Sequence, residues 1–258
     1  MKLNILKCFY CCCTCWKKRN TFDLERRELN ILLLGMKSVG KTEVGYILAG
    51  KKRTIYETTN GVQCYKTRLP KCSLAITEVG GNRQSEKLWH HYYSRTMGLI
   101  YCYDMSIDDQ QLQTSFQLLN KIVSHQFMRG KVMLLVGTKS DLVNDTIQLY
   151  DIENRFALEN LANKYFMKIK TIHFNPNKLE SLWNGIEWLA NNININYSNL
   201  KNRIENDNDI EKTLKKQQQK SIKFSNRRAK TAPASINSSQ HRRSSLIFPW
   251  NMHHTNVF

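Results

Sequence analysis

The chain has 258 residues, with 39 Lys and Arg against 21 Asp and Glu, a formal net charge of +18. That length accommodates one good-sized domain with extensions or two small domains, and the 41% of hydrophobic residues support a folded core. The charge favours a polyanionic partner, either nucleic acid or an anionic membrane surface. No apolar run reaches about 18 residues, so no membrane span is predicted. The N-terminal segment also lacks the long apolar region of a secretory signal.

Residues 1–27 form a basic head that holds five of the eight cysteines. Their spacing is no disulfide framework and indicates a reducing compartment. Two C-x-x-C pairs have metal-ligand spacing, but no distant Cys or His pair completes a site. Because Lys2 excludes N-myristoylation, we favour acylation over metal binding or inert thiols, and the acceptors would be Cys8, Cys11, Cys12, Cys13 and Cys15.

From residue 28 to about 195, short apolar runs alternate with stripes of apolar residues at helical spacing. The runs typical of buried parallel strands are 30–35, 74–79, 98–104 and 131–137. The helical stripes are 112–123 and 179–193. This alternation predicts one α/β domain with a mostly parallel sheet and helices on both faces.

An eight-residue motif closes the first predicted strand. GMKSVGKT, residues 35–42, fits G-x-x-x-x-G-K-[ST] and is followed by helical spacing. Such a loop wraps backbone N–H groups around phosphates at a helix N-terminus. We expect Lys41 to reach the β- and γ-phosphates and the Thr42 hydroxyl to bind Mg²⁺. The predicted nucleotide contacts here are Gly35, Ser38, Val39, Gly40, Lys41, Thr42 and Glu43.

The second predicted strand ends in Glu78 and the glycine pair Gly80 and Gly81. Paired glycines indicate a close approach to the backbone or an unusual dihedral angle. A simple turn is the alternative when these residues are taken alone. Beside a phosphate site, we expect Glu78 to hold Mg²⁺ through water and the Gly81 N–H to meet the γ-phosphate.

A third motif, GTKSD at residues 137–141, closes the next long apolar strand. Asp141 can accept hydrogen bonds from the N1–H and the exocyclic amine of guanine. The stem of Lys139 can pack over the purine ring, and Thr138 precedes it. These residues predict a preference for a guanine base.

Residues 196–258 form a basic tail. Helical spacing persists for about two turns through Tyr197, Leu200 and Ile204, and Asp207 and Asp209 then interrupt it; a short coiled coil is an alternative. From Lys212 to Arg243 the chain has ten Lys and Arg and no acid. Beyond Ser221 the composition predicts disorder.

The motifs of residues 29 to about 195 resemble those of small GTPases, and among them the Arf-like group. ETTNGV (57–62) is similar to switch I, with Thr59 as the threonine that closes on Mg²⁺ and the γ-phosphate. KLWHHYYSRTMGLIYCYD (87–104) resembles the switch II helix and the strand after it. The resemblance implies a P-loop small-GTPase fold, GTP or GDP as ligand, and Mg²⁺ held by Thr42, Thr59 and Glu78.

The head is similar to that of the ciliary, palmitoylated Arf-like subfamily, which has a cysteine cluster followed by Trp and basic residues. That similarity implies a lipid anchor on the cytoplasmic face of a membrane, with the ciliary membrane as one candidate, and a role in membrane or ciliary trafficking.

Four departures from the family pattern bear on function. Glu78 stands where the family has Asp, and Thr138 stands where Asn is common. Asn82 occupies the position of the water-orienting Gln and is one methylene shorter, so we expect slow intrinsic hydrolysis. Phe174, in HFN (173–175), occupies the loop that usually gives a backbone N–H to the guanine oxygen, which weakens the guanine prediction.

Two hypotheses follow. The first is a membrane-anchored GTP-dependent switch that is a weak GTP hydrolase, with Gly81 and the altered Asn82 at its catalytic position. The second is a pseudo-GTPase scaffold that binds nucleotide statically or not at all; the P-loop and Thr59 favour the first. We expect a monomer whose head and tail contact anionic membrane. A nucleic-acid partner ranks last, and the sequence does not identify the effector, exchange factor or GAP.

Overall fold

The computed structural model describes residues 26–52, 58–143 and 149–231. Within them a six-stranded sheet has the order β2-β3-β1-β4-β5-β6. Strand β2 is antiparallel to β3, and the other neighbours are parallel. The strands are β1 (Glu28–Leu34), β2 (Val62–Arg68), β3 (Ser73–Val79), β4 (Gly98–Asp104), β5 (Val132–Thr138) and β6 (Ile169–His173).

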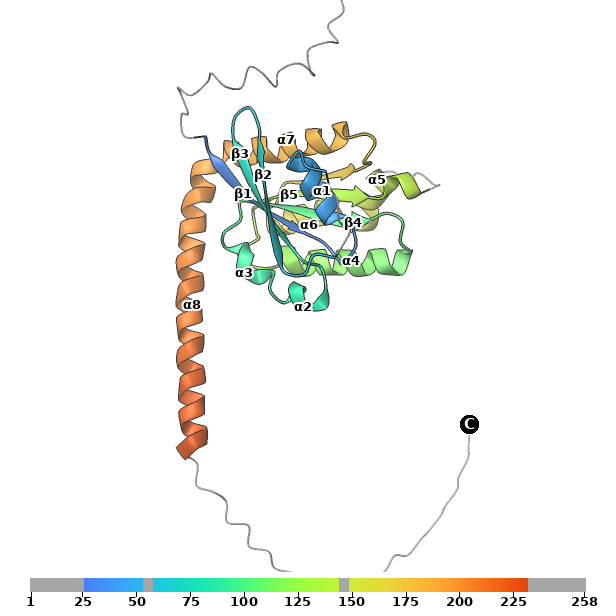
Figure 1. Ribbon diagram of the computed structural model, residues 1–258. Coiled ribbons are helices and arrows are strands. Elements are labelled where there is room, and N and C mark those ends of the chain that lie inside the picture. Colours follow the sequence, from blue (N-terminus) through green and yellow to red (C-terminus); the bar gives the residue numbers. More distant parts are fainter. Residues whose placement is uncertain (1–25, 53–57, 144–148, 232–258) are drawn as a thin grey trace, which may run out of the picture. The chain divides into compact units, whose positions relative to one another are not determined.

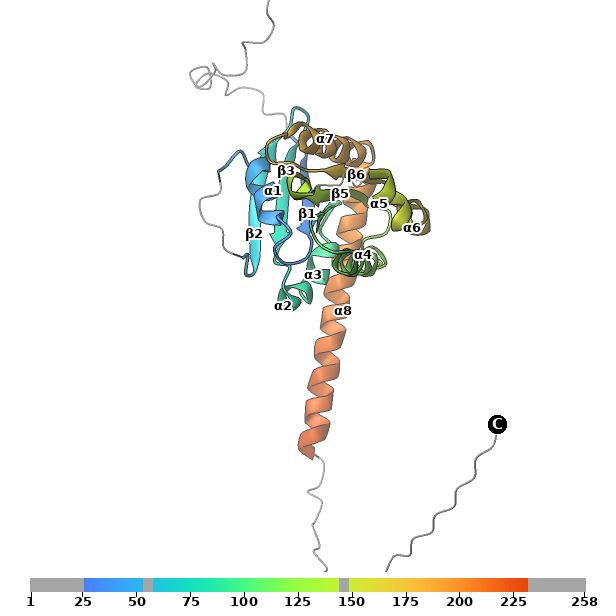
Figure 2. The same ribbon diagram turned by 90° about the vertical axis from the view of Figure 1, so that its right-hand side faces the viewer.

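Helices cover both faces of this sheet (Figures 1 and 2). Helices α1 and α7 pack on one face, and α4, α5 and α6 pack on the other. The helices are α1 (Lys41–Leu48), α2 (Arg83–Glu86), α3 (His90–Tyr93), α4 (Asp109–Val123), α5 (Leu149–Arg155), α6 (Leu158–Tyr165), α7 (Glu180–Ile195) and α8 (Tyr197–Thr231), with a 3₁₀ turn η2 (Ser140–Leu142). The predicted mostly parallel α/β fold is confirmed.

The alternation of side chains along β1 explains why its run of residues is almost wholly apolar. Ile31 and Leu33 point into the core under α1 and α7, whereas Leu32 and Leu34 point into the core under α4. Because both faces are covered, a central parallel strand has no polar side. The four strands and two helices expected from such patterns are all present.

The apolar patterns did not reveal β2 and β6. Strand β2 lies at the sheet edge, and Lys66 and Arg68 on it are exposed, so its residues do not form an apolar run. Strand β6 lies at the opposite edge and spans five residues. Edge strands need less apolar sequence because part of their surface faces water.

Helix α8 is longer than the sequence predicts. It continues past Asp207 and Asp209, and also past Ser221, to Thr231. Its buried positions explain the first extension, since Leu200, Ile204, Asp207 and Glu211 share one face at helical spacing and all lie buried. Asp207 therefore continues the stripe as a buried polar residue rather than ending it.

The chain divides into two compact units, Met1–Thr213 and Leu214–Phe258. Of the second unit, the structure describes the last part of α8. Residues 1–25 and 232–258, which include the cysteine head and the rest of the predicted disordered tail, lie outside the described residues. No helix in the described part has the length and apolar character to cross a bilayer.

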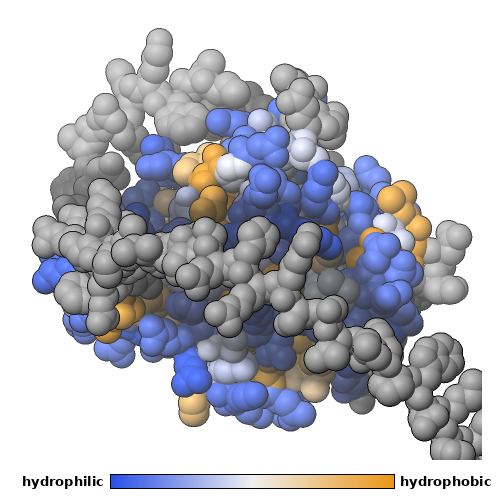
Figure 3. All heavy atoms as spheres, turned by 90° about the horizontal axis from the view of Figure 1, so that it is seen from below, coloured by the Kyte–Doolittle hydropathy of each residue, from blue (hydrophilic) through white to orange (hydrophobic). Residues whose placement is uncertain are grey.

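The visible surface on the side of helices α2 and α3 is mostly polar (Figure 3). On the face in Figure 3, the described residues are predominantly hydrophilic, and the hydrophobic ones form small separate groups. One exposed apolar side chain near these helices is Leu88, between α2 and α3, at 45%. The described residues that are visible on this face in Figure 3 therefore form no broad apolar area.

Candidate functional site

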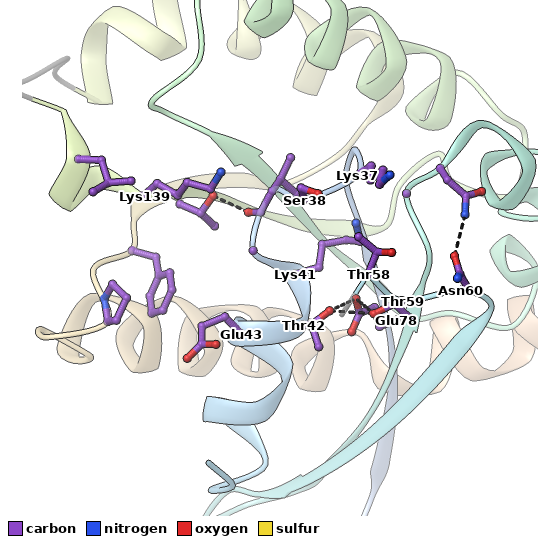
Figure 4. Close-up of a pocket in the computed structure, with 18 of the residues that line it drawn as sticks. Lys37, Ser38, Lys41, Thr42, Glu43, Thr58, Thr59, Asn60, Glu78 and Lys139 are labelled. Carbon is purple, nitrogen blue, oxygen red and sulfur yellow. Dashed lines mark hydrogen bonds between the residues drawn. The ribbon is translucent and has the colours of Figure 1, made fainter. Parts of the chain in front are cut away.

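A cavity of about 580 Å³ lies beyond the carboxyl ends of the parallel strands (Figure 4). This is where α/β sheets commonly bind ligands. Its walls come from the loop after β1, the start of α1, the ends of β3 and β5, and the loop after β6. The lining residues are Lys37, Ser38, Val39, Gly40, Lys41, Thr42, Glu43, Thr58, Thr59, Asn60, Glu78, Gly81, Asn82, Thr138, Lys139, Asp141, Leu142, Phe174 and Pro176.

The structure brings together every residue predicted to contact nucleotide or Mg²⁺ except Gly35. Gly35 has a φ of +149° and lies on the carbonyl of Cys102, where a Cβ atom would come within 2.3 Å of that oxygen. Gly35 therefore allows the loop to pack against β4, and it does not line the cavity. Five further lining residues were not predicted from the sequence, because they lie beside the motifs but at none of their defining positions: Lys37, Thr58, Asn60, Leu142 and Pro176.

The ammonium of Lys41, near the end of the loop of residues 35–42, contacts the start of that loop. Gly40 is left-handed, with φ 87°, and immediately precedes α1. The Lys41 ammonium donates to the carbonyls of Gly35 at 2.9 Å and Met36 at 2.8 Å. Burial lowers the pKa of Lys41, and the nearby Cys102 and Glu78 oppose that shift. The loop thus combines a helix N-terminus and a buried ammonium, an arrangement that favours an anion.

The glycine pair after β3 packs against the backbone of this loop. A Cβ atom on Gly81 would lie 2.3 Å from the carbonyl oxygen of Gly35, and one on Gly80 would lie 2.6 Å from that of Thr59. The Gly80 carbonyl also accepts a 2.9 Å hydrogen bond from the indole of Trp89. Close approach, rather than a turn alone, therefore requires both glycines, and the neighbour that approaches is the protein backbone.

Three oxygen-bearing side chains converge at the floor of the cavity, where Figure 4 shows them linked by dashed lines. The Thr42 hydroxyl donates to Oε1 of Glu78 at 2.7 Å and lies 2.9 Å from the Thr59 hydroxyl. Thr59 donates to the same Oε1 at 3.3 Å. Glu78 is fully buried. Two hydroxyls and a carboxylate are the oxygen ligands that a hard cation such as Mg²⁺ takes, so the donor set fits that ion.

At the far end of the cavity, Thr138 ties two elements together. Its Oγ1 lies 2.6 Å from the Val39 carbonyl and 2.9 Å from the Tyr103 carbonyl, and its single proton can serve one of them at a time. Lys139 is left-handed, with φ 58°, and its ammonium lies 2.5 Å from Oδ2 of Asp104. Asp104 closes β4 and was assigned no role from the sequence; its terminal position in an apolar run was the available signal.

Two N–H groups in the loop after β6 make hydrogen bonds within the protein. The N–H of Phe174 donates to the Gly137 carbonyl at 2.7 Å, and the Phe174 ring is buried. The N–H of Asn177 donates to Oδ1 of Asn175 at 2.8 Å. Pro176, which lines the cavity between them, has no N–H. The N–H groups of Phe174 and Asn177 are therefore already engaged within the protein.

The side chain of Asn82 makes its hydrogen bonds within the protein. Its Oδ1 accepts the N–H of Ser85 at 2.7 Å, which caps α2. Its Nδ2 donates to Oδ1 of Asn60 at 3.4 Å. The side chain lines the cavity, but its carbonyl oxygen is engaged as a helix cap.

Comparison with known proteins places this geometry in a family. A family model described as the ADP-ribosylation factor family matches residues 17–193. Among solved structures, the chain is similar to the Arl6 BBS3 small GTPase from Trypanosoma brucei with the bound nucleotide analogue GppNp. The TM-score is 0.56 with 18% identity, over 64% of this chain and 96% of that chain. At that identity the likeness supports the shared fold.

Proposed function

Because the chain belongs to the ADP-ribosylation factor family, whose small GTPases bind GTP and GDP, we propose that it is a membrane-anchored, GTP-dependent switch with slow intrinsic hydrolysis. The family and the fold support the GTP-binding switch itself. The anchor, the slow hydrolysis and a role in membrane or ciliary trafficking are the finer parts of the proposal.

The observation that carries the proposal is the convergence of Lys41 and the cluster of Thr42, Thr59 and Glu78 on one cavity. Lys41 would exchange its contacts with loop carbonyls for phosphate oxygens. Thr42, Thr59 and Glu78 would hold Mg²⁺, which neutralises charge on the phosphates when bound. Because Thr59 lies on the chain that enters β2, its contact with the cluster would link the nucleotide state to that segment.

Asn82 supports slow hydrolysis. A residue that orients the attacking water must reach the γ-phosphate side with a free amide group. Here the amide carbonyl caps α2, and the side chain is one methylene shorter than Gln. A partner that supplies an arginine would then be the natural source of faster turnover.

The membrane part of the proposal rests on the head sequence. Cys8, Cys11, Cys12, Cys13 and Cys15 are candidate acylation sites, and the basic residues after them would meet anionic lipid. Two or more acyl chains hold a protein stably, whereas one holds it marginally. Changing single cysteines to Ser should therefore matter little, and changing all five should release the protein from membranes. Labelling with a clickable palmitate analogue measures acylation, and a five-Ser variant that stays in the membrane pellet contradicts a cysteine anchor.

The nucleotide content of the purified protein distinguishes the switch from the pseudo-GTPase alternative. Gentle purification followed by acid release should yield close to one guanine nucleotide per chain. Lys41→Ala should abolish it, since it removes the buried ammonium of the phosphate loop. Lys37→Ala is the matched control, because that lysine lines the cavity without belonging to the motif's defining positions. Equal nucleotide retention by wild type and Lys41→Ala contradicts the switch. In the wild type, ATP that competes as well as GTP contradicts the guanine assignment.

A further inference from the structure

The carboxylate of Glu78 is held from both sides. Its Oε1 accepts the hydroxyls of Thr42 and Thr59, and its Oε2 accepts the hydroxyl of Tyr65 at 2.7 Å. Both Glu78 and Tyr65 are buried. A buried carboxylate with directed donors on each oxygen has its orientation set by those donors.

The register of the sheet brings Tyr65 to this position. Strands β2 and β3 are antiparallel, with Gln63 opposite Glu78 and Tyr65 opposite Ile76. Tyr65 and Gln63 share a face of β2, so Tyr65 is the diagonal neighbour of Glu78 on the same face. At that separation a long aromatic side chain reaches the carboxylate.

Gly45 makes room for the tyrosine ring. A Cβ atom on Gly45 would lie 2.3 Å from Cε2 and 2.5 Å from Cζ of Tyr65. Glycine inside a helix weakens that helix, so its presence in α1 needs a local reason. The reason is steric, because only a residue without a side chain allows the ring to cross α1 and place its hydroxyl on Glu78.

We propose that Tyr65, seated on Gly45, is the positioning residue for the Mg²⁺ site. Glu78 is one methylene longer than the Asp that the family places there, so it has one more rotatable bond to restrain. Tyr65 anchors Oε2 and leaves Oε1 directed at Thr42 and Thr59. The three residues Gly45, Tyr65 and Glu78 thus act as one unit that adapts the longer acid to the cation.

This inference rests on the proposed function, because it concerns the cation that accompanies GTP. The test uses the full chain loaded with a non-hydrolysable GTP analogue. Binding of Mn²⁺ in place of Mg²⁺ is followed by the electron paramagnetic resonance signal of the free ion, and nucleotide release is followed with and without chelator.

We expect Tyr65→Phe to weaken Mn²⁺ binding about tenfold, the scale of one hydrogen bond to a charged group. Nucleotide release in chelator should stay unchanged, because the phosphate and base contacts remain. Tyr46→Phe is the matched control. The ring centroid of Tyr46 lies 5.7 Å from that of Tyr65, and the Tyr46 hydroxyl accepts a hydrogen bond from Nε2 of Gln63. Gly45→Ala should repeat the Tyr65→Phe effect, since the new methyl group displaces the ring while keeping the hydroxyl.

The decisive comparison is whether the effect of changing Tyr65 depends on the acid at position 78. In a Glu78→Asp background the shorter acid draws away from Tyr65, so Tyr65→Phe should then change Mn²⁺ affinity little. If Tyr65→Phe leaves Mn²⁺ affinity at the wild-type value while thermal unfolding shows an intact fold, the positioning role is wrong and the proposed function stands. If the wild type binds the GTP analogue with no dependence on the cation, both the positioning role and the Mg²⁺ site fail.

Discussion

The hydroxyl of Ser94, directly after α3, donates a 2.5 Å hydrogen bond to Oε2 of Glu211 on α8. Both residues are buried. The imidazole of His91, within α3, lies 4.0 Å from the other carboxylate oxygen of Glu211. The first half of α8, up to Thr213, is therefore joined to the segment that resembles switch II.

Ser94→Ala should lower the free energy of unfolding by about 1–3 kcal/mol, because it removes a donor from a buried carboxylate. Urea denaturation followed by circular dichroism measures the change. Ser124→Ala is the control, since that exposed hydroxyl bonds the Lys121 carbonyl of its own helix. Equal stability of the two variants would show that Glu211 is held by its other contacts.

The buried Lys131 should make the free energy of unfolding depend on pH. Its ammonium is fully buried and donates to the Tyr93 carbonyl at 2.6 Å. Burial, assisted by Arg203 and opposed by Asp207, lowers its pKa from 10.5 to about 7. Between pH 7 and about 10 the unfolded chain holds a proton that the folded chain has released, so stability rises with pH in that window.

Lys131→Met should remove this rise. The measurement is the free energy of unfolding at pH 7 and pH 9 for both proteins, and the exposed Lys121→Met is the matched control on α4. Burial also raises the pKa of the neighbouring Asp207 carboxyl from 3.8, and Lys131 and Arg203 oppose that shift. Parallel pH curves for wild type and Lys131→Met would mean that Lys131 keeps its proton in the folded state.

Asn82→Gln should raise intrinsic GTP hydrolysis by about tenfold, equivalent to a barrier lower by 1.4 kcal/mol, if reach limits the rate. The same change loses the cap on α2 and should lower stability by about 1 kcal/mol. Single-turnover phosphate release and thermal unfolding measure the two effects. Asn82→Ser keeps a capping oxygen without the reach, so it should stay stable and slow. An unchanged rate in Asn82→Gln would direct attention to Glu78.

Pro176→Ala should strengthen the preference for GTP over ATP by about fivefold, the scale of one hydrogen bond. The change gives the cavity wall an N–H that proline lacks, in a turn whose Lys178 N–H already bonds the Asn175 carbonyl at 3.0 Å. Nucleotide competition measures it, with Pro70→Ala, between β2 and β3, as control. If selectivity does not move, an N–H at position 176 does not contribute to base recognition.

The sequence by itself determined the phosphate loop, the acid and glycines after β3, and GTKSD. Each is a contiguous motif whose function follows from local backbone geometry, and the structure places their side chains around one cavity. The central strands and the helices α4 and α7 could also be predicted from the sequence. Burial on both faces makes a strand continuously apolar, and burial along one stripe gives a helix apolar residues at helical spacing.

Only the tertiary structure decided the contacts between residues that lie far apart in the sequence. Tyr65 meets Glu78 through strand register, Lys139 meets Asp104 across neighbouring strands, and Glu211 meets Ser94 over 117 positions of sequence. Asp207 looked like the end of a helix, yet it is a buried part of it. A hydrogen bond between distant residues leaves no periodicity in the sequence, because its geometry exists only once the strands have paired and the helices have packed.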